Sequence, residues 1–181
     1  MIEPTKIPYA IVAYTKEGMK TMGFFQKILG KTKNELCAPV SGEVIPLSQV
    51  SDPTFATEMV GKGVAIRPAA GAIVAPCAGK VDMVFETGHA ITLIADCGAE
   101  ILIHVGLDTV NLKGEHFQIK TKSGQKVSTG DLLLEFDRAA IAAAGYDTVT
   151  PVVVCNPEHF EKLETYIGKT VIAGEPVIGL S

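Results

Sequence analysis

Two histidines that lie fifteen residues apart, His89 and His104, have the clearest potential for chemistry in this sequence. Each lies in a run that alternates between apolar and polar residues, as a β-strand does. Between the two runs, residues 95–98 suit a four-residue hairpin loop, because Gly98 can adopt a positive φ. Counting outward from this loop places His89 directly opposite His104. We therefore predict an antiparallel hairpin whose two imidazoles share one face, with Cβ atoms roughly 4.5–5.5 Å apart.

The neighbours of the two histidines predict a face that is partly apolar and carries one hydroxyl group. Strand alternation places Leu102 and Gly106 on the face of His104, and it turns Ile101, Ile103 and Val105 toward the core. By the same alternation, the partner strand presents Thr87, His89 and Ile91 on one face. Three interpretations remain open. The histidines could only hydrogen-bond each other, they could bind a metal, or one could accept a phosphoryl group that the other imidazole and the threonine hydroxyl orient.

Missing motifs bear on these interpretations. A catalytic zinc ion usually has three protein ligands, and the sequence contains neither H-x-H nor H-E-x-x-H. The sequence also lacks G-x-x-x-x-G-K-[ST] and the glycine-rich loop of kinases. A phosphoryl group on a histidine would then come from another phosphoprotein rather than from a nucleotide. Such a transfer requires an apolar docking surface with a few charges that fix the register.

Length and composition describe an ordinary globular chain. Its 181 residues are enough for one domain with a sizeable core, and 47% of them are hydrophobic. The formal net charge of −4 argues against a nucleic-acid-binding surface. Four cysteines without C-x-x-C spacing, and no leader that ends in a small-residue cleavage site, predict reduced thiols and a cytoplasmic protein. No apolar run approaches the roughly 20 residues that span a bilayer.

Short strands and turns predominate from Cys37 onward. Turn signals that recur about every 8–12 residues predict an all-β antiparallel sandwich. The strand-like segments are residues 42–46, 64–67, 71–74, 79–85, 90–95, 100–105, 116–120, 132–136, 149–155 and 170–180. One or two short helices are expected, at 138–145 and 157–166. Residues 126–134 resemble residues 170–178, which indicates either two related hairpins or two instances of a common turn.

Longer blocks of sequence carry a family resemblance. They are APVSGEV at 38–44, VGKGVAIRP at 60–68, APCAG at 75–79, FETGHA at 85–90, HVGLDTVNLKG at 104–114 and TPVVV at 150–154. In these blocks the chain resembles the glucose-type enzyme IIA component of the bacterial phosphoenolpyruvate-dependent sugar phosphotransferase system. The resemblance implies an antiparallel β-sandwich or distorted barrel with a duplicated hybrid motif over residues 36–181. It also implies a phosphotransferase component, a phosphocarrier that drives sugar uptake and phosphorylation.

The same resemblance implies the roles of individual residues and partners. His104 would carry the phosphoryl group as tele-phosphohistidine, His89 would support it, and Thr87 would hydrogen-bond within the site. The phosphocarrier HPr would donate the group and a cysteine of a sugar-specific IIB domain would accept it, with no required cofactor. The expected docking rim consists of Asp52, Phe55, Met59, Val60, Phe85, Leu102, Asp108 and Val110. Zinc could bind to His89 and His104 only with a ligand from outside.

Further expectations concern the N-terminus and assembly. Residues 1–35 are expected to form an extension whose segment 22–33 is amphipathic and could contact a membrane surface, and residues 1–21 could precede the native start. The chain is expected to be a monomer. Gly88 and Asn111 differ from the residues common in enteric members, so the sequence leaves open whether regulatory partners of the enteric kind, such as glycerol kinase or adenylate cyclase, apply to this chain.

Two other classes of function remain as alternatives. One is a zinc-dependent hydrolase on the related lysostaphin-type sandwich, because His104 and Asp108 superficially fit the first motif of that group. The other is a non-catalytic adaptor similar to lipoyl or biotinyl β-modules, which the Gly130-Asp131 turn suggests.

Overall fold

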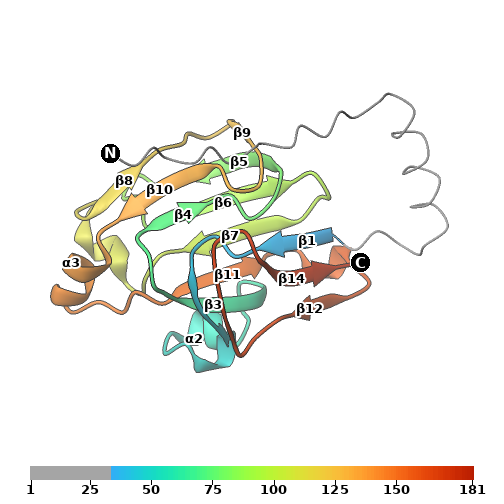
Figure 1. Ribbon diagram of the computed structural model, residues 1–181, viewed down its shortest axis with the longest axis horizontal. Coiled ribbons are helices and arrows are strands. Elements are labelled where there is room, and N and C mark those ends of the chain that lie inside the picture. The colour runs from blue at the N-terminus through green and yellow to red at the C-terminus, as the bar shows by residue number, and fades with distance from the viewer. Residues whose placement is uncertain (1–33) are drawn as a thin grey trace, which may run out of the picture. The chain divides into compact units, whose positions relative to one another are not determined.

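The computed structural model describes residues 34–181, in which most of the regular secondary structure is β-strand (Figure 1). The large sheet has eight strands, in the order β13 (Lys169–Val171), β2 (Gly42–Pro46), β3 (Lys62–Pro68), β11 (Thr150–Val154), β7 (Glu100–His104), β6 (Ala90–Ala95), β5 (Gly79–Val84) and β9 (Lys126–Val127). Two three-stranded sheets complete the fold. One consists of β1 (Asn34–Cys37), β14 (Pro176–Leu180) and β12 (Leu163–Thr165), and the other of β4 (Ala72–Val74), β10 (Leu132–Phe136) and β8 (Phe117–Ile119).

All neighbouring strands are antiparallel, and the sheets do not close into a barrel. The predicted all-β sandwich is therefore confirmed. The expected N-terminal extension, its boundary at residue 35 and its amphipathic segment lie almost wholly outside the described residues, and they stay predictions. None of the helices in the described part of the chain is long and apolar enough to span a membrane.

Strand β11 separates two hydrophobic clusters. All five of its residues are buried, as a short, continuous apolar run predicts. Val152 and Val154 belong to the main core, whereas Val153 points to a smaller cluster that contains Phe55 and Leu107. The smaller cluster lies on the side of the sheet that carries His104, because Val153 pairs with Leu102 on β7. The face of the sheet that carries His104 therefore packs against a buried apolar cluster.

Helices are few and short in residues 34–181. Helix α3 (Arg138–Ala143) confirms the expected helix, and Asp137 caps it by accepting a hydrogen bond from Ala140 N at 2.9 Å. Helix α2 (Pro53–Ala56) was not expected from the sequence. The predicted helix at 157–166 is wrong, because that segment forms the 3₁₀ turn η3 (Pro157–His159) followed by β12, which pairs with β14. The predicted strand 170–180 is in fact two strands, β13 and β14.

The two similar sequence segments, residues 126–134 and 170–178, make matching strand pairings and hydrogen bonds. After β9, Gly130 N donates to Ala75 O at 2.9 Å, and after β13, Gly174 N donates to Ala38 O, also at 2.9 Å. In the same way, β9 pairs with β5 and β13 pairs with β2. This repeated pattern of hydrogen bonds favours two related hairpins over two independent turns.

The β6–β7 hairpin carries the site, and its register differs from the prediction. Ala90, not His89, lies opposite His104. The loop has three residues, 96–98, rather than four, because Ala95 N donates to Ala99 O at 2.9 Å. Gly98 adopts a φ of 87°, as a type I turn followed by a left-handed residue requires. The one-residue slip also places Ile91 in the core, opposite Ile103, so the prediction that Ile91 shares the face of His89 is wrong. The prediction that the Thr87 hydroxyl lies near the histidine pair is confirmed, because Thr87 Oγ1 contacts His89 Nδ1.

Candidate active site

His104 is the last residue of β7, and its side chain is partly buried. Its Nδ1 lies 2.7 Å from Gly106 O. Because a carbonyl oxygen can only accept, Nδ1 carries the proton and donates it. In the neutral ring, the lone pair is then on Nε2. The backbone therefore makes Nε2 the nucleophilic atom of this imidazole.

His89 lies just before β6, in a bend where Gly88 has a φ of 68°. The ring is buried, and its Nδ1 lies 2.5 Å from Thr87 Oγ1. The backbone continues the hairpin, because Val105 N donates to His89 O at 2.7 Å. The centroids of the His89 and His104 rings are 5.0 Å apart, and the ring planes meet at 79°. The prediction that the imidazoles meet is confirmed, although the bend rather than the strand register brings them together.

Both imidazoles are held in the neutral form. Burial, together with the neighbouring His104, lowers the pKa of His89 to about 4. Burial also lowers the pKa of His104, although the hydrogen bond to Gly106 O and the charges of Asp52 and Asp108 oppose that shift. A neutral imidazole can act as a nucleophile, whereas a protonated one cannot. The nearby carboxylates would stabilise a positive charge if one developed on His104.

Aromatic rings flank the histidine pair on both sides. Phe55 packs on His104 with a centroid distance of 5.2 Å, and Phe85 packs on His89 at 5.3 Å. Phe55 is buried in the smaller apolar cluster, against which Val60 and Leu102 also pack. Helix α2 presents Phe55, and Asp52 caps that helix by accepting a hydrogen bond from Thr54 N at 2.8 Å.

The remaining expected rim residues are exposed around this centre. Met59 follows α2 and is 75% exposed, and Val110 lies in the 3₁₀ turn η2 (Thr109–Leu112) and is 47% exposed. Asp108 precedes η2 in the left-handed conformation, with a φ of 56°. Large exposed apolar side chains such as these are typical of a surface that another protein covers.

Sequence reasoning missed the role of the Gly106 carbonyl. Gly106 has a φ of 77°, and a Cβ added there would lie 2.5 Å from Thr109 Cγ2 and 2.8 Å from Asp147 O. No side chain fits at this position, so the glycine is needed for the turn that aims its carbonyl at His104. A glycine two residues after a histidine at the end of a strand was the signal available in the sequence.

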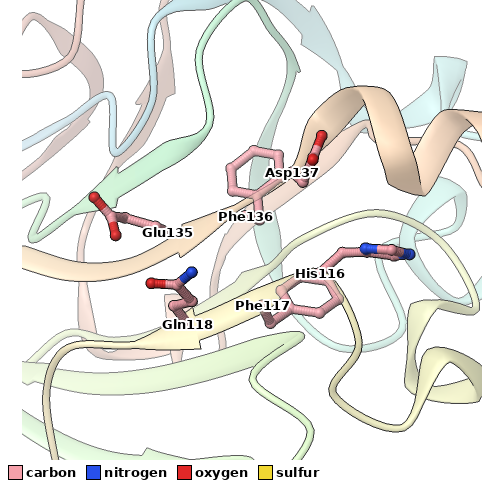
Figure 2. Close-up of a pocket in the computed structure, with 6 residues that line it drawn as sticks. All are labelled: His116, Phe117, Gln118, Glu135, Phe136 and Asp137. Atoms are coloured by element: carbon pink, nitrogen blue, oxygen red, sulfur yellow. The ribbon is translucent and has the colours of Figure 1, made fainter.

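Neither a metal-binding cluster nor the pocket between β8 and β10 indicates a second functional site in the described residues. Within residues 34–181, no cluster of three or more His, Cys, Asp or Glu side chains could hold a metal ion. Figure 2 shows a pocket between β8 and β10 that does not include the histidine pair; it is lined by His116, Phe117, Gln118, Glu135, Phe136 and Asp137. Several of its polar groups are already bonded, since Lys120 binds both Gln118 and Glu135.

Comparisons with known proteins identify the relatives of this chain. Residues 34–160 match the family model of the phosphoenolpyruvate-dependent sugar phosphotransferase system, EIIA 1. The chain is 46% identical over 138 residues to the PTS system glucose-specific EIIA component of Oceanobacillus iheyensis, and the match covers 76% of this chain and 84% of that protein. It is 41% identical over 157 residues to the glucose-specific EIIA component of Buchnera aphidicola, with coverage of 87% and 97%.

A longer relative and a solved structure add to this result. The chain is 48% identical over 152 residues to the PTS system beta-glucoside-specific EIIBCA component of Dickeya chrysanthemi, but it spans only 24% of that protein. The solved structure of glucose permease IIA from Mycoplasma capricolum matches with a TM-score of 0.76 and 32% sequence identity, over 82% of this chain and 96% of that one. Neither a zinc hydrolase nor a lipoyl-type or biotinyl-type adaptor receives support from these comparisons.

Proposed function

This chain belongs to the EIIA 1 family of the phosphoenolpyruvate-dependent sugar phosphotransferase system, and we propose that His104 is the residue on which it carries the phosphoryl group. The family role is that of a phosphocarrier, a phosphotransferase component of sugar transport. The hydrogen bond from His104 Nδ1 to Gly106 O is the single observation that carries the assignment to this residue. It leaves the Nε2 lone pair of a neutral ring free to attack phosphorus.

In the proposed transfer, a phosphoryl group moves from a histidine of the donor protein to His104. Nε2 of His104 attacks the phosphorus atom of a donor phosphohistidine, the donor N–P bond breaks, and its electron pair returns to the donor imidazole. The phosphorylated ring of His104 keeps the Nδ1 proton and becomes positively charged. Gly106 O accepts the hydrogen bond from that Nδ1–H group, and Asp52 and Asp108 supply negative charge nearby.

His89 supports the transferred group through its second nitrogen. When Thr87 Oγ1 donates its hydrogen to His89 Nδ1, Nε2 of His89 carries a proton. That N–H group can donate to a phosphoryl oxygen on the adjacent ring, whose centroid lies 5.0 Å away. His89 is therefore a hydrogen-bond donor in this mechanism, and His104 is the nucleophile.

Two protein partners follow from this assignment. A IIB domain is the acceptor, since the EIIBCA relatives combine the same type of domain with IIB and IIC parts in one chain. We take HPr as the donor, and a IIB cysteine as the atom that receives the group. Exposed Met59 and Val110 offer apolar contact to either partner, and Asp52 and Asp108 offer negative charge to a basic residue.

The donor set of the site also limits metal binding. Both Nδ1 atoms are in use, so His89 and His104 could offer only their Nε2 atoms to zinc. Zinc takes four ligands, so it would need further ligands from a partner. The proposed transfer requires no cofactor.

A phosphoryl-transfer assay tests the assignment. The protein is incubated with phosphoenolpyruvate, enzyme I and HPr, and the acid-labile phosphate is located by mass spectrometry of peptides. We expect one phosphoryl group on His104 and none on the His104→Ala variant. The His89→Gln variant should accept phosphate but pass it to IIB slowly. Full labelling of His104→Ala would refute the assignment, and NMR spectra of both variants would show that the fold is intact.

A further inference from the structure

The carbonyl that orients His104 lies in a tight turn, residues 105–109, that one threonine closes. Thr109 is completely buried, and its hydroxyl donates to Val105 O at 2.6 Å. Within this turn both Gly106 and Asp108 have positive φ values, of 77° and 56°. Because such conformations are strained for residues other than glycine, the turn needs fixed contacts to keep its shape. The Thr109 hydroxyl supplies one of them.

The methyl group of Thr109 makes a second contact in the same turn. A Cβ added to Gly106 would lie 2.5 Å from Thr109 Cγ2, so this methyl group covers the face of the glycine directly. The backbone before β11 also contacts this turn, since Gly106 N donates to Val149 O at 3.1 Å and Leu107 N donates to Asp147 O at 2.9 Å. Both this backbone and the Thr109 side chain therefore hold the Gly106 peptide in place.

We propose that Thr109 is a positioning residue for phosphoryl transfer: its buried hydroxyl closes the 105–109 turn, and the turn holds the Gly106 carbonyl that keeps the proton of His104 on Nδ1. Thr109 itself does not touch the phosphoryl group. If the carbonyl moved away, the neutral ring of His104 could place its proton on Nε2, and that tautomer has no lone pair at the reacting atom. The inference builds on the proposed role of His104 as phosphoacceptor.

Two substitutions separate the hydroxyl from the methyl group. Thr109→Val keeps the branched shape and removes the hydroxyl, whereas Thr109→Ser keeps the hydroxyl. Thr121→Val is the matched control, because Thr121 is a buried threonine whose hydroxyl has no hydrogen-bond partner in the described part of the chain. The ¹⁵N chemical shifts of the His104 ring report the tautomer in the unphosphorylated protein. Transfer from phospho-HPr then gives kcat and KM.

In the wild-type protein we expect the Nδ1–H tautomer of His104 to predominate. Thr109→Val should raise the ratio of the Nε2–H to the Nδ1–H tautomer about three- to tenfold, as the loss of one hydrogen bond predicts. It should lower kcat by the same factor as it lowers the fraction of the Nδ1–H tautomer, with little change in KM. Thr109→Ser should restore the wild-type tautomer, and Thr121→Val should change neither measurement. If Thr109→Val does not fold, Thr109→Ala must give the same shift of tautomer.

The two readouts distinguish the possible failures. A wild-type tautomer in folded Thr109→Val would overturn the positioning role, even if His104 is the phosphorylated residue. A lower kcat together with an unchanged tautomer would also overturn it, because the loss would then have another cause. Absence of phosphate from His104 in the wild-type protein would refute the proposed function instead, and the NMR result on Thr109 would still stand.

Discussion

The buried, neutral state of His89 predicts that acid destabilises this protein through one identifiable residue. The imidazole titrates near pH 6.5 when it is exposed in the unfolded chain, whereas burial lowers its pKa to about 4 in the folded protein. Between these values the unfolded state binds more protons than the folded state. The free energy of unfolding therefore falls as the pH falls from above 6.5 toward 4, and it is highest where both states are neutral.

The size of this effect follows from the two pKa values. Going from about pH 7.5 to about pH 5, the unfolded imidazole becomes almost fully protonated while the folded one remains mostly neutral, which removes about 2 kcal/mol of stability. Solvent screens this effect little, because His89 as a residue is only 6% exposed. The loss would approach about 3 kcal/mol near pH 4, where the carboxylates also begin to titrate.

Urea unfolding of the wild type and of His89→Gln across this pH range tests the prediction. Glutamine keeps a polar side chain of similar length but does not titrate, so the wild type should lose about 2 kcal/mol more than the variant between about pH 7.5 and pH 5. His104→Gln should also weaken the pH dependence, because burial lowers the pKa of that histidine as well. Parallel stability curves for the wild type and His89→Gln would refute the claim that His89 is buried and neutral.

Three further outcomes are expected. In urea unfolding, Gly106→Ala should destabilise the fold by at least about 1 kcal/mol more than Gly98→Ala. Both glycines have a positive φ, but only at Gly106 would an added Cβ meet close neighbours. Equal losses of stability in the two variants would contradict this. Thr87→Val, which removes the hydroxyl bonded to the supporting imidazole, should slow phosphoryl transfer about two- to tenfold in stopped-flow assays, and an unchanged rate would argue against that support. Val110→Lys should raise KM for the IIB partner about tenfold, whereas Ile172→Lys, at another exposed apolar position, should not.

Local patterns in the sequence predicted the strands well and predicted their connections poorly. Residues 90–95 and 132–136 form β6 and β10 as expected, because their apolar runs are bounded by clear turn signals. The sequence predicts a four-residue loop between β6 and β7, which is one residue longer than the loop in the structure. Gly98 suits a three-residue loop as well as a four-residue one, and only the pairing of whole strands decides between them.

The helices show the limit of local signals in another way. Four residues, Pro53–Ala56, are too few for a helical period, so α2 had only Asp52 and Pro53 as a start signal. Pro157 gave a similar signal, but the chain after η3 pairs with β14 instead of continuing as a helix. In residues 157–166, strand pairing thus overrode the local preference for a helix. In α2, the packing of Phe55 in the smaller apolar cluster stabilised a short helix.

The unequal roles of the two histidines depend on the chemical type of the atom that each Nδ1 meets. His104 Nδ1 faces a carbonyl, which can only accept, so its tautomer is set by the backbone. His89 Nδ1 faces a hydroxyl, which can donate or accept, so the proton of this ring can be carried on Nε2 instead. The distinction cannot be read from residue types, because every residue has a carbonyl and only the turn around Gly106 directs this one toward the ring. In the transfer that we propose, two adjacent, neutral imidazoles of the same chemistry thereby act as a nucleophile and a hydrogen-bond donor.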